Sequence, residues 1–198
     1  PMEKALSEEV MIARKMNGEP IPRDHGFPVR LIVPGFVGVR NLKWIKSCWI
    51  QDSEVESIWQ TGASYKVFEP WVEDLNGILV SRYPSIMTMP VQSAVVAWEK
   101  DQVTRVAGYA WCGGGHGIKC VEVSTDGGKE WKLARLKQGS EQDPDKSWAW
   151  TFWEAEIPVE ATRVICRAET VTGEVQPVQA PWNIRGLCNN SYHEVSLE

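Results

Sequence analysis

Residues 118–131 have the sequence IKCVEVSTDGGKEW, and this stretch decides the fold class that we predict for the second half of the chain. Val121 and Val123 alternate with polar residues, a period of two that is typical of a strand with one buried face. Asp126-Gly127-Gly128 follows directly, and glycine supplies the positive φ that tight hairpin turns require. We therefore predict a β-hairpin whose second strand begins at Trp131.

Runs of the same kind continue on both sides of this hairpin and are separated by turn residues at fairly regular intervals. Seven short strands with this spacing suit a β-sandwich. The predicted strands are 91–98, 103–112, 118–124, 131–136, 148–157, 162–168 and 191–197. The change of pattern at Met89-Pro90 predicts a domain boundary, with one domain over 1–88 and a second over 89–198.

The first 88 residues are less regular. Ser7-Glu8-Glu9 carries acidic groups suited to the positive end of a helix, so we predict a short helix from there to Asn17-Gly18. Between 19 and 38 the prolines and glycines exclude long helices, because proline lacks a backbone donor and has a fixed φ. We predict short strands at 29–33 and 44–50, and a loop-rich stretch from 51 to 85.

Composition excludes several classes of function. A net charge of -5 and a pI near 5.4 provide no field that would attract nucleic acid. No stretch approaches the roughly 18 apolar residues that a membrane span needs. The five cysteines show no spacing typical of zinc ligands, so we expect free thiols and predict no metal ligand among them. Any anion site must therefore be local.

One segment is dense in cations although the chain is acidic overall. Arg23, His25, Arg30, Arg40 and Lys43 lie within 21 residues on a backbone that proline and glycine hold in place. A guanidinium fork beside an ammonium group and an imidazole suits a phosphate monoester. The alternative is that these side chains simply face water, as basic residues on loops often do.

The same segment resembles the sulfite oxidase family and the related eukaryotic nitrate reductases. The run from Asn17 to Arg30, which includes His25-Gly26-Phe27-Pro28-Val29-Arg30, carries the match, together with the Pro-Gly-x-x-Gly-x-Arg-x-x-Lys-Trp spacing over 34–44. The resemblance covers nearly the whole chain. It continues in Met89-Pro90-Val91-Gln92-Ser93-Ala94, Gly108-Tyr109-Ala110-Trp111, Gly113-Gly114-Gly115, Ser124-Thr125-Asp126-Gly127-Gly128, Trp148-Ala149-Trp150, Val175-Gln176-Pro177 and Trp182-Asn183-Ile184-Arg185-Gly186.

This resemblance implies a mainly β protein in two parts. Residues 1–88 would be the later part of a mixed α+β molybdopterin-binding domain, and residues 89–198 an immunoglobulin-like β-sandwich that dimerises. It also implies that His25 and Arg30 contact the molybdopterin cofactor and its phosphate. Lys43, with Arg40 and Asn41 beside it, would complete the same wall.

Two further residues match the family's catalytic positions. The resemblance implies that Tyr65 is the active-site tyrosine and that Arg185 is one of the arginines that bind sulfite. For each residue there is also an alternative role that does not involve catalysis and that its residue type alone suggests. Tyr65 would then be a half-buried aromatic residue with its hydroxyl in water, and Arg185 would form a surface ion pair.

The family's molybdenum-ligating cysteine lies in a segment upstream of the matching run. None of the five cysteines here has that context. A thiolate is needed to hold the oxo-metal centre, so we expect that this chain by itself does not retain an active molybdenum cofactor. Whether the chain is itself an enzyme is therefore an open question at this point.

Two functions of different class remain. The first is oxidation of sulfite to sulfate by oxygen-atom transfer, when the chain is joined to the half that carries the cysteine. The second is a non-catalytic, truncated relative that acts as a structural or assembly subunit. For both we expect a homodimer or a subunit of a larger assembly, no nucleic acid and no membrane span. The compartments of relatives favour the mitochondrion.

Overall fold

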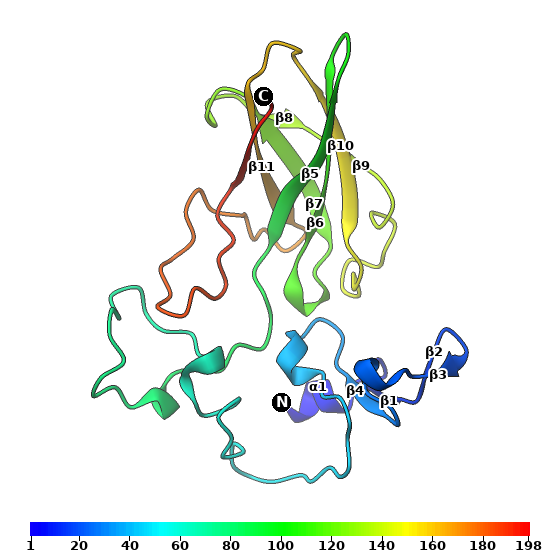
Figure 1. The fold of residues 1–198 in the computed structure, drawn as a ribbon, viewed down its shortest axis with the longest axis vertical. Coiled ribbons are helices and arrows are strands. Elements are labelled where there is room, and N and C mark those ends of the chain that lie inside the picture. The colour runs from blue at the N-terminus through cyan, green and yellow to red at the C-terminus, as the bar shows by residue number, and fades with distance from the viewer. The chain divides into compact units, whose positions relative to one another are not determined.

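The computed structural model describes residues 1–198, and it is mainly β, as predicted. Two compact units divide the chain (Figure 1). The first contains 1–88 together with Trp182–Leu187, and the second contains 89–181 together with 188–198. The segment Trp182–Leu187, which the sequence prediction placed in the second domain, therefore packs with the first unit. No helix has the length and apolar character that crossing a membrane demands.

The second unit consists of two four-stranded antiparallel sheets. The first sheet has the order β5 (Gln92–Lys100), β6 (Thr104–Trp111), β10 (Thr151–Ile157) and β9 (Arg135–Leu136). The second has the order β12 (His193–Ser196), β11 (Arg163–Thr170), β7 (Ile118–Ser124) and β8 (Lys132–Leu133). The 3₁₀ turn η5 (Gly113–Gly115) lies between β6 and β7. The finer prediction that this unit is immunoglobulin-like stays a prediction.

Both sheets contribute to a single hydrophobic core. Strand β10 alternates strictly between buried and exposed residues, as a strand does when one face is covered. Trp153 from β10 is 1% exposed and packs with Val106, Val121 and Val164, which come from β6, β7 and β11. The two inner faces therefore form a sandwich core, which is the arrangement that the alternation predicted.

The predicted hairpin is confirmed, because Gly127 and Gly128 have φ values of 83° and 88° between β7 and β8. The predicted strand 131–136 is wrong as a single element. Its first half, β8, pairs with β7, whereas its second half, β9, pairs with β10 of the other sheet. Ala134 lies between the two halves. Such a strand changes sheet at a corner of the sandwich, and hydrophobic alternation cannot reveal the change.

The first unit contains little regular structure. It comprises α1 (Met2–Ala5), the paired strands β1 (Met11–Ala13) and β4 (Arg30–Ile32), the paired strands β2 (Lys15–Met16) and β3 (Glu19–Pro20), and the 3₁₀ turns η1 (Arg23–His25), η2 (Gly38–Arg40), η3 (Ala63–Tyr65) and η4 (Val80–Arg82). The prediction of a loop-rich stretch from 51 to 85 is confirmed, and so is a short strand within 29–33.

Two predicted elements of this unit are wrong. The helix expected from Ser7 is replaced by β1, in which Ile12 pairs with Leu31, so tertiary pairing overrides the local signal. Asn17 and Gly18, taken as a helix end, have φ values of 52° and 86° and connect β2 to β3, as an Asn-Gly hairpin turn does. Residues 44–50 form no strand, because no neighbouring strand pairs with them.

Candidate functional site

Three predicted cations converge on the turn that follows η1. Gly26 ends η1 with φ 116°, and a Cβ at this position would lie 3.1 Å from the Cβ atoms of both Arg30 and Lys43. Arg30 Nη1 donates to the His25 carbonyl at 3.2 Å, and Lys43 Nζ donates to the Asp24 carbonyl at 2.8 Å. The structure therefore brings His25, Arg30 and Lys43 together, and we call them the cationic clamp.

Aromatic packing and one unused donor complete the clamp. Trp44 Nε1 donates to the Arg23 carbonyl at 2.8 Å, and Lys43 Nζ lies 4.7 Å from the centre of the Trp44 ring. The Nε atom of Arg30 is buried but has no hydrogen-bond partner within the chain. Because a buried donor without an acceptor is unfavourable, this atom favours an anionic ligand. His25 and Lys43 are exposed, so the clamp is open to solvent.

Arg40 contacts a different part of the first unit. Its Nε donates to the Ile86 carbonyl at 3.2 Å, and its Nη1 donates to the Gln60 side chain. The Ile86 amide in turn donates to the Tyr65 carbonyl at 2.8 Å. Burial lowers the pKa of the Arg40 guanidinium, and nearby Glu54 and Tyr65 act in the opposite direction. Arg40 is thus grouped with Tyr65, and its Nη2 is buried without a partner.

Asn41 is occupied by the loop that carries it. Its Oδ1 accepts from the Val33 amide at 2.6 Å, and its Nδ2 donates to the carbonyls of Phe36 and Val37 at 3.1 and 3.2 Å. These bonds hold the loop between β4 and η2 in shape. The cofactor contact predicted for Asn41 stays a prediction, and the observed contacts assign its side chain to positioning.

Sequence reasoning missed Lys66, which is fully buried beside Tyr65. Its Nζ donates to Ser85 Oγ at 2.9 Å and lies 3.8 Å from the Glu54 carboxylate. Gln60 and Ser85 both donate to the same carboxylate. We call Arg40, Glu54, Gln60, Tyr65, Lys66 and Ser85 the Lys66 assembly. No periodic signal in the loop-rich stretch could have revealed it, because its members meet only through tertiary contacts.

Tyr65 and Arg185 belong to this same region. The Tyr65 ring is half-buried, and its centre lies 6.1 Å from that of Trp59. Asn183 Nδ2 donates to the Lys66 carbonyl at 3.4 Å, and Asn183 Oδ1 accepts from the Arg185 amide at 2.8 Å. Arg185 is exposed and forms no ion pair within the chain, so the alternative of a surface ion pair does not hold for it.

All five cysteines are free, as predicted. Burial, with a contribution from Glu174, raises the pKa of Cys112 to about 12. Burial raises the pKa of Cys166 to about 11. Both thiols therefore stay protonated near neutral pH, which makes them unsuitable as nucleophiles.

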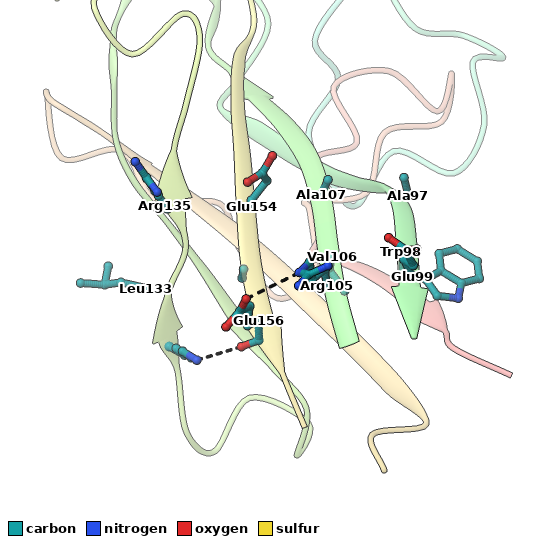
Figure 2. Close-up of a pocket in the computed structure, with 12 residues that line it drawn as sticks. Ala97, Trp98, Glu99, Arg105, Val106, Ala107, Leu133, Arg135, Glu154 and Glu156 are labelled. Carbon is teal, nitrogen blue, oxygen red and sulfur yellow. Dashed lines mark hydrogen bonds and ion pairs between the residues drawn. The ribbon is translucent and has the colours of Figure 1, made fainter. Parts of the chain in front are cut away.

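A separate groove lies on the outer face of the β5-β6-β10-β9 sheet and contains none of the predicted site residues. Its volume is about 650 Å³. Figure 2 shows Ala97 and Ala107 on neighbouring strands and Glu156 facing Arg105, whose Nε lies 3.7 Å from the Glu156 carboxylate. The groove is lined by small and charged side chains and by the exposed apolar residues Trp98 and Leu133.

Comparisons with known proteins agree with these features. The family described as "Mo-co oxidoreductase dimerisation domain" matches residues 78–198, and the "oxidoreductase molybdopterin binding domain" matches residues 1–59. Mitochondrial sulfite oxidase of Homo sapiens is 43% identical over 211 residues, an alignment that covers 100% of this chain. The chain belongs to the sulfite oxidase family.

Other members of the sulfite oxidase family and its relatives match at lower identity. Sulfite oxidase of Arabidopsis thaliana is 40% identical over 96% of the chain, and nitrate reductase [NADH] of Solanum lycopersicum is 31% identical over 96%. Among solved structures, the sulfane dehydrogenase SoxCD from Paracoccus pantotrophus has a TM-score of 0.76 and 28% identity, and the match covers 100% of this chain and 50% of that one.

This member of the sulfite oxidase family spans only part of its relatives. The chain corresponds to 38% of the human protein, 51% of the Arabidopsis protein and 23% of the tomato nitrate reductase.

Proposed function

We propose that this chain forms the cofactor-phosphate side and the substrate-anion side of an enzyme that oxidises sulfite to sulfate. The observation that carries the proposal is the grouping of Arg40, Tyr65 and the segment of Arg185 around the buried Lys66, with Arg40 Nη2 unpaired. These are donors suited to a small oxyanion. The family to which the chain belongs supports the same chemistry.

The cationic clamp fits the phosphate of a molybdopterin cofactor. Arg30 has a buried Nε without an acceptor, Lys43 has an ammonium group nearby, and the absence of a side chain at Gly26 allows Arg30 and Lys43 to lie close together. When bound, the cofactor would supply the redox-active metal centre for oxygen-atom transfer. The roles of this chain's own residues are to bind the phosphate through charge-assisted hydrogen bonds and to hold it in place.

The Lys66 assembly and Arg185 would handle the substrate. Ionised sulfite carries two negative charges, so the guanidinium groups of Arg40 and Arg185 would neutralise it and lower the cost of bringing it out of water. The Tyr65 hydroxyl would donate a hydrogen bond and orient the anion. Held donors of this kind require little rearrangement during the reaction.

The test is steady-state sulfite oxidation by the complete, cofactor-loaded gene product that contains this chain. In Arg185→Gln we expect the KM for sulfite to rise about 10- to 100-fold, because a charged hydrogen-bond donor contributes about 1.5–3 kcal/mol. Arg135→Gln is the matched control, since Arg135 is an exposed arginine of the other unit. Absence of sulfite turnover in the wild-type protein would reject the proposal and favour a structural subunit.

We also propose a partner and a compartment. The second unit belongs to a dimerisation-domain family, which supports a homodimer formed through the sandwich. The similar proteins of Homo sapiens and Drosophila melanogaster are named mitochondrial, which supports the mitochondrion for this chain. Chemical cross-linking and cell fractionation with an antibody to the chain would test the two proposals separately.

A further inference from the structure

We propose that Asn183 is a positioning residue that sets where Arg185 lies relative to Tyr65. This inference rests on the proposed function, because it assigns Arg185 and Tyr65 to one anion site. Asn183 itself does not touch the substrate in this proposal. Asn183 acts through hydrogen bonds to two backbone groups, the Lys66 carbonyl and the Arg185 amide.

Asn183 is a buried connection between two segments that are far apart in the sequence. Its side chain is 8% exposed, although both neighbouring positions are more accessible. Its Oδ1 accepts from the Arg185 amide at 2.8 Å, and its own carbonyl accepts from the Gly186 amide at 2.7 Å. Both bonds close a tight turn that places Arg185 at its exposed end.

The other half of the amide reaches Lys66. Asn183 Nδ2 donates to the Lys66 carbonyl, 117 residues away in sequence, at 3.4 Å. Lys66 is itself held in place, because its ammonium group is buried against Ser85. Lys66 also follows Tyr65 directly in the sequence. The Arg185 turn is therefore tied to a rigid point one residue from Tyr65.

The position of Arg185 depends on the hydrogen bond between Asn183 and Lys66, because the Arg185 side chain makes no hydrogen bond or ion pair that would hold it in place. It is exposed and makes no ion pair within the chain, and a free arginine side chain samples many rotamers. A turn that is fixed at its base limits the region that the guanidinium can reach. A binding group that is not held in place must lose more conformational freedom when the anion binds, so this restriction matters for the affinity of an anion site.

Two variants separate the two hydrogen bonds of the Asn183 side chain, one with the Lys66 carbonyl and one with the Arg185 amide. Asn183→Asp keeps an acceptor for the Arg185 amide but loses the donor to the Lys66 carbonyl, whereas Asn183→Ala removes both. Asn190→Ala is the matched control. Asn190 is also 8% exposed and also donates to a backbone carbonyl, that of Val91, but it belongs to the other unit.

Two readouts are measured on the complete, cofactor-loaded protein. The first is the split between KM and kcat for sulfite. In Asn183→Ala we expect KM to rise about tenfold or more with kcat changed much less, and we expect Asn183→Asp to be intermediate. The second is the rate of tryptic cleavage after Arg185, which we expect to rise several-fold in Asn183→Ala because the turn opens more often.

The control decides between positioning and a general loss of stability. We expect Asn190→Ala to lower the melting temperature comparably while leaving both the KM and the cleavage rate after Arg185 at the wild-type values. The inference is overturned if Asn183→Ala and Asn190→Ala change these two quantities equally. If the wild-type protein does not oxidise sulfite, the proposed function fails, and the cleavage rate still decides whether Asn183 holds the Arg185 turn.

Discussion

The Arg40 guanidinium uses two of its three nitrogens within the chain and leaves the third buried without an acceptor. A buried donor that is left unpaired costs about 1–3 kcal/mol, so an anion that pairs with it recovers this cost on binding. Burial also lowers the pKa of the group, which a bound anion would oppose. Arg40 therefore has the features of a substrate-binding group.

Arg40→Lys tests this assignment, because lysine keeps the charge but not the planar fork. We expect the KM for sulfite to rise about 10- to 100-fold, since the loss of directed donors to a charged ligand costs about 1.5–3 kcal/mol. Steady-state kinetics of the complete protein measures the change. Arg82→Lys, at an exposed arginine of the same unit, is the control, and equal KM values in the two variants would contradict the assignment.

The cysteines give a prediction that depends on pH. Because burial raises the pKa of Cys112 to about 12 and of Cys166 to about 11, both stay protonated when the pH is 8. The thiolate is the reactive form, so we expect iodoacetamide to modify the exposed Cys48 first and to leave both buried cysteines intact until the protein unfolds. Peptide mass spectrometry over time measures this order. Early labelling of Cys112 would show that this part of the core is open.

At the scale of the elements, strand β6 approaches its neighbours too closely for a side chain at Gly108. A Cβ there would overlap with the Ala94 carbonyl oxygen of β5 and with the Trp153 ring of β10. The absence of a side chain at Gly108 therefore allows the Trp153 ring to be fully buried between the sheets. Glycine in a strand often marks such a close approach.

Gly108→Ala should therefore destabilise the sandwich by overpacking, at a cost of about 1–3 kcal/mol. The free energy of unfolding in urea, followed by tryptophan fluorescence, measures the loss. Gly38→Ala is the control, because Gly38 has no positive φ and a Cβ there would meet nothing within 4 Å. Unchanged stability in Gly108→Ala would mean that β5 or Trp153 shifts freely, contrary to a closely packed core.

For the whole molecule, the outer faces of the two sheets differ in a way that bears on self-association. The face of the β12-β11-β7-β8 sheet carries the ion pairs Arg163–Glu194, Arg167–Glu122 and Lys119–Glu169. The face of the other sheet also carries ion pairs, Arg105–Glu156 and Lys137–Glu154. In addition it carries an exposed aromatic cluster in which Trp150 stacks on Tyr109 at 4.3 Å and meets Phe152 edge-on. Aromatic residues are enriched at the centres of protein interfaces.

If the protein forms the proposed homodimer through this aromatic face, Phe152→Asp should weaken it. We expect the dissociation constant of the dimer to rise about tenfold or more, because a charge would replace a central apolar contact. Sedimentation velocity over a range of concentrations measures the constant. Val159→Asp, at an apolar residue of similar exposure outside the strands, is the control, and equal effects would place the interface elsewhere.

The path of the chain also matters at this scale. After Pro181 the chain leaves the second unit, contributes Trp182–Leu187 to the first, and returns at Cys188 before forming β12. The sequence predicted a single domain over 89–198, because hydrophobic alternation and turn residues depend only on near neighbours in sequence. The six residues Trp182–Leu187 show no periodicity, so nothing in their sequence indicates that they pack with the first unit.

The sequence by itself determined what depends on local periodicity and on special residues. Alternation and turn glycines predicted the strands of the sandwich and the Asp126-Gly127-Gly128 turn, and the density of cations between Arg23 and Lys43 indicated an anion site. The strands and the turn are confirmed, because a strand face and a positive φ are properties of short segments. The anion site stays a prediction.

Only the tertiary structure decided which residues act together. It grouped Arg40 with Tyr65 and not with His25, Arg30 and Lys43. It also buried Lys66 next to Tyr65 and tied Asn183 to the Lys66 carbonyl, 117 residues away in sequence. It also assigned the two halves of 131–136 to different sheets. The physical reason is the same in each case: such contacts form when distant segments pack, and the free energy that selects them comes from burial and hydrogen bonding in the folded chain, not from any local pattern.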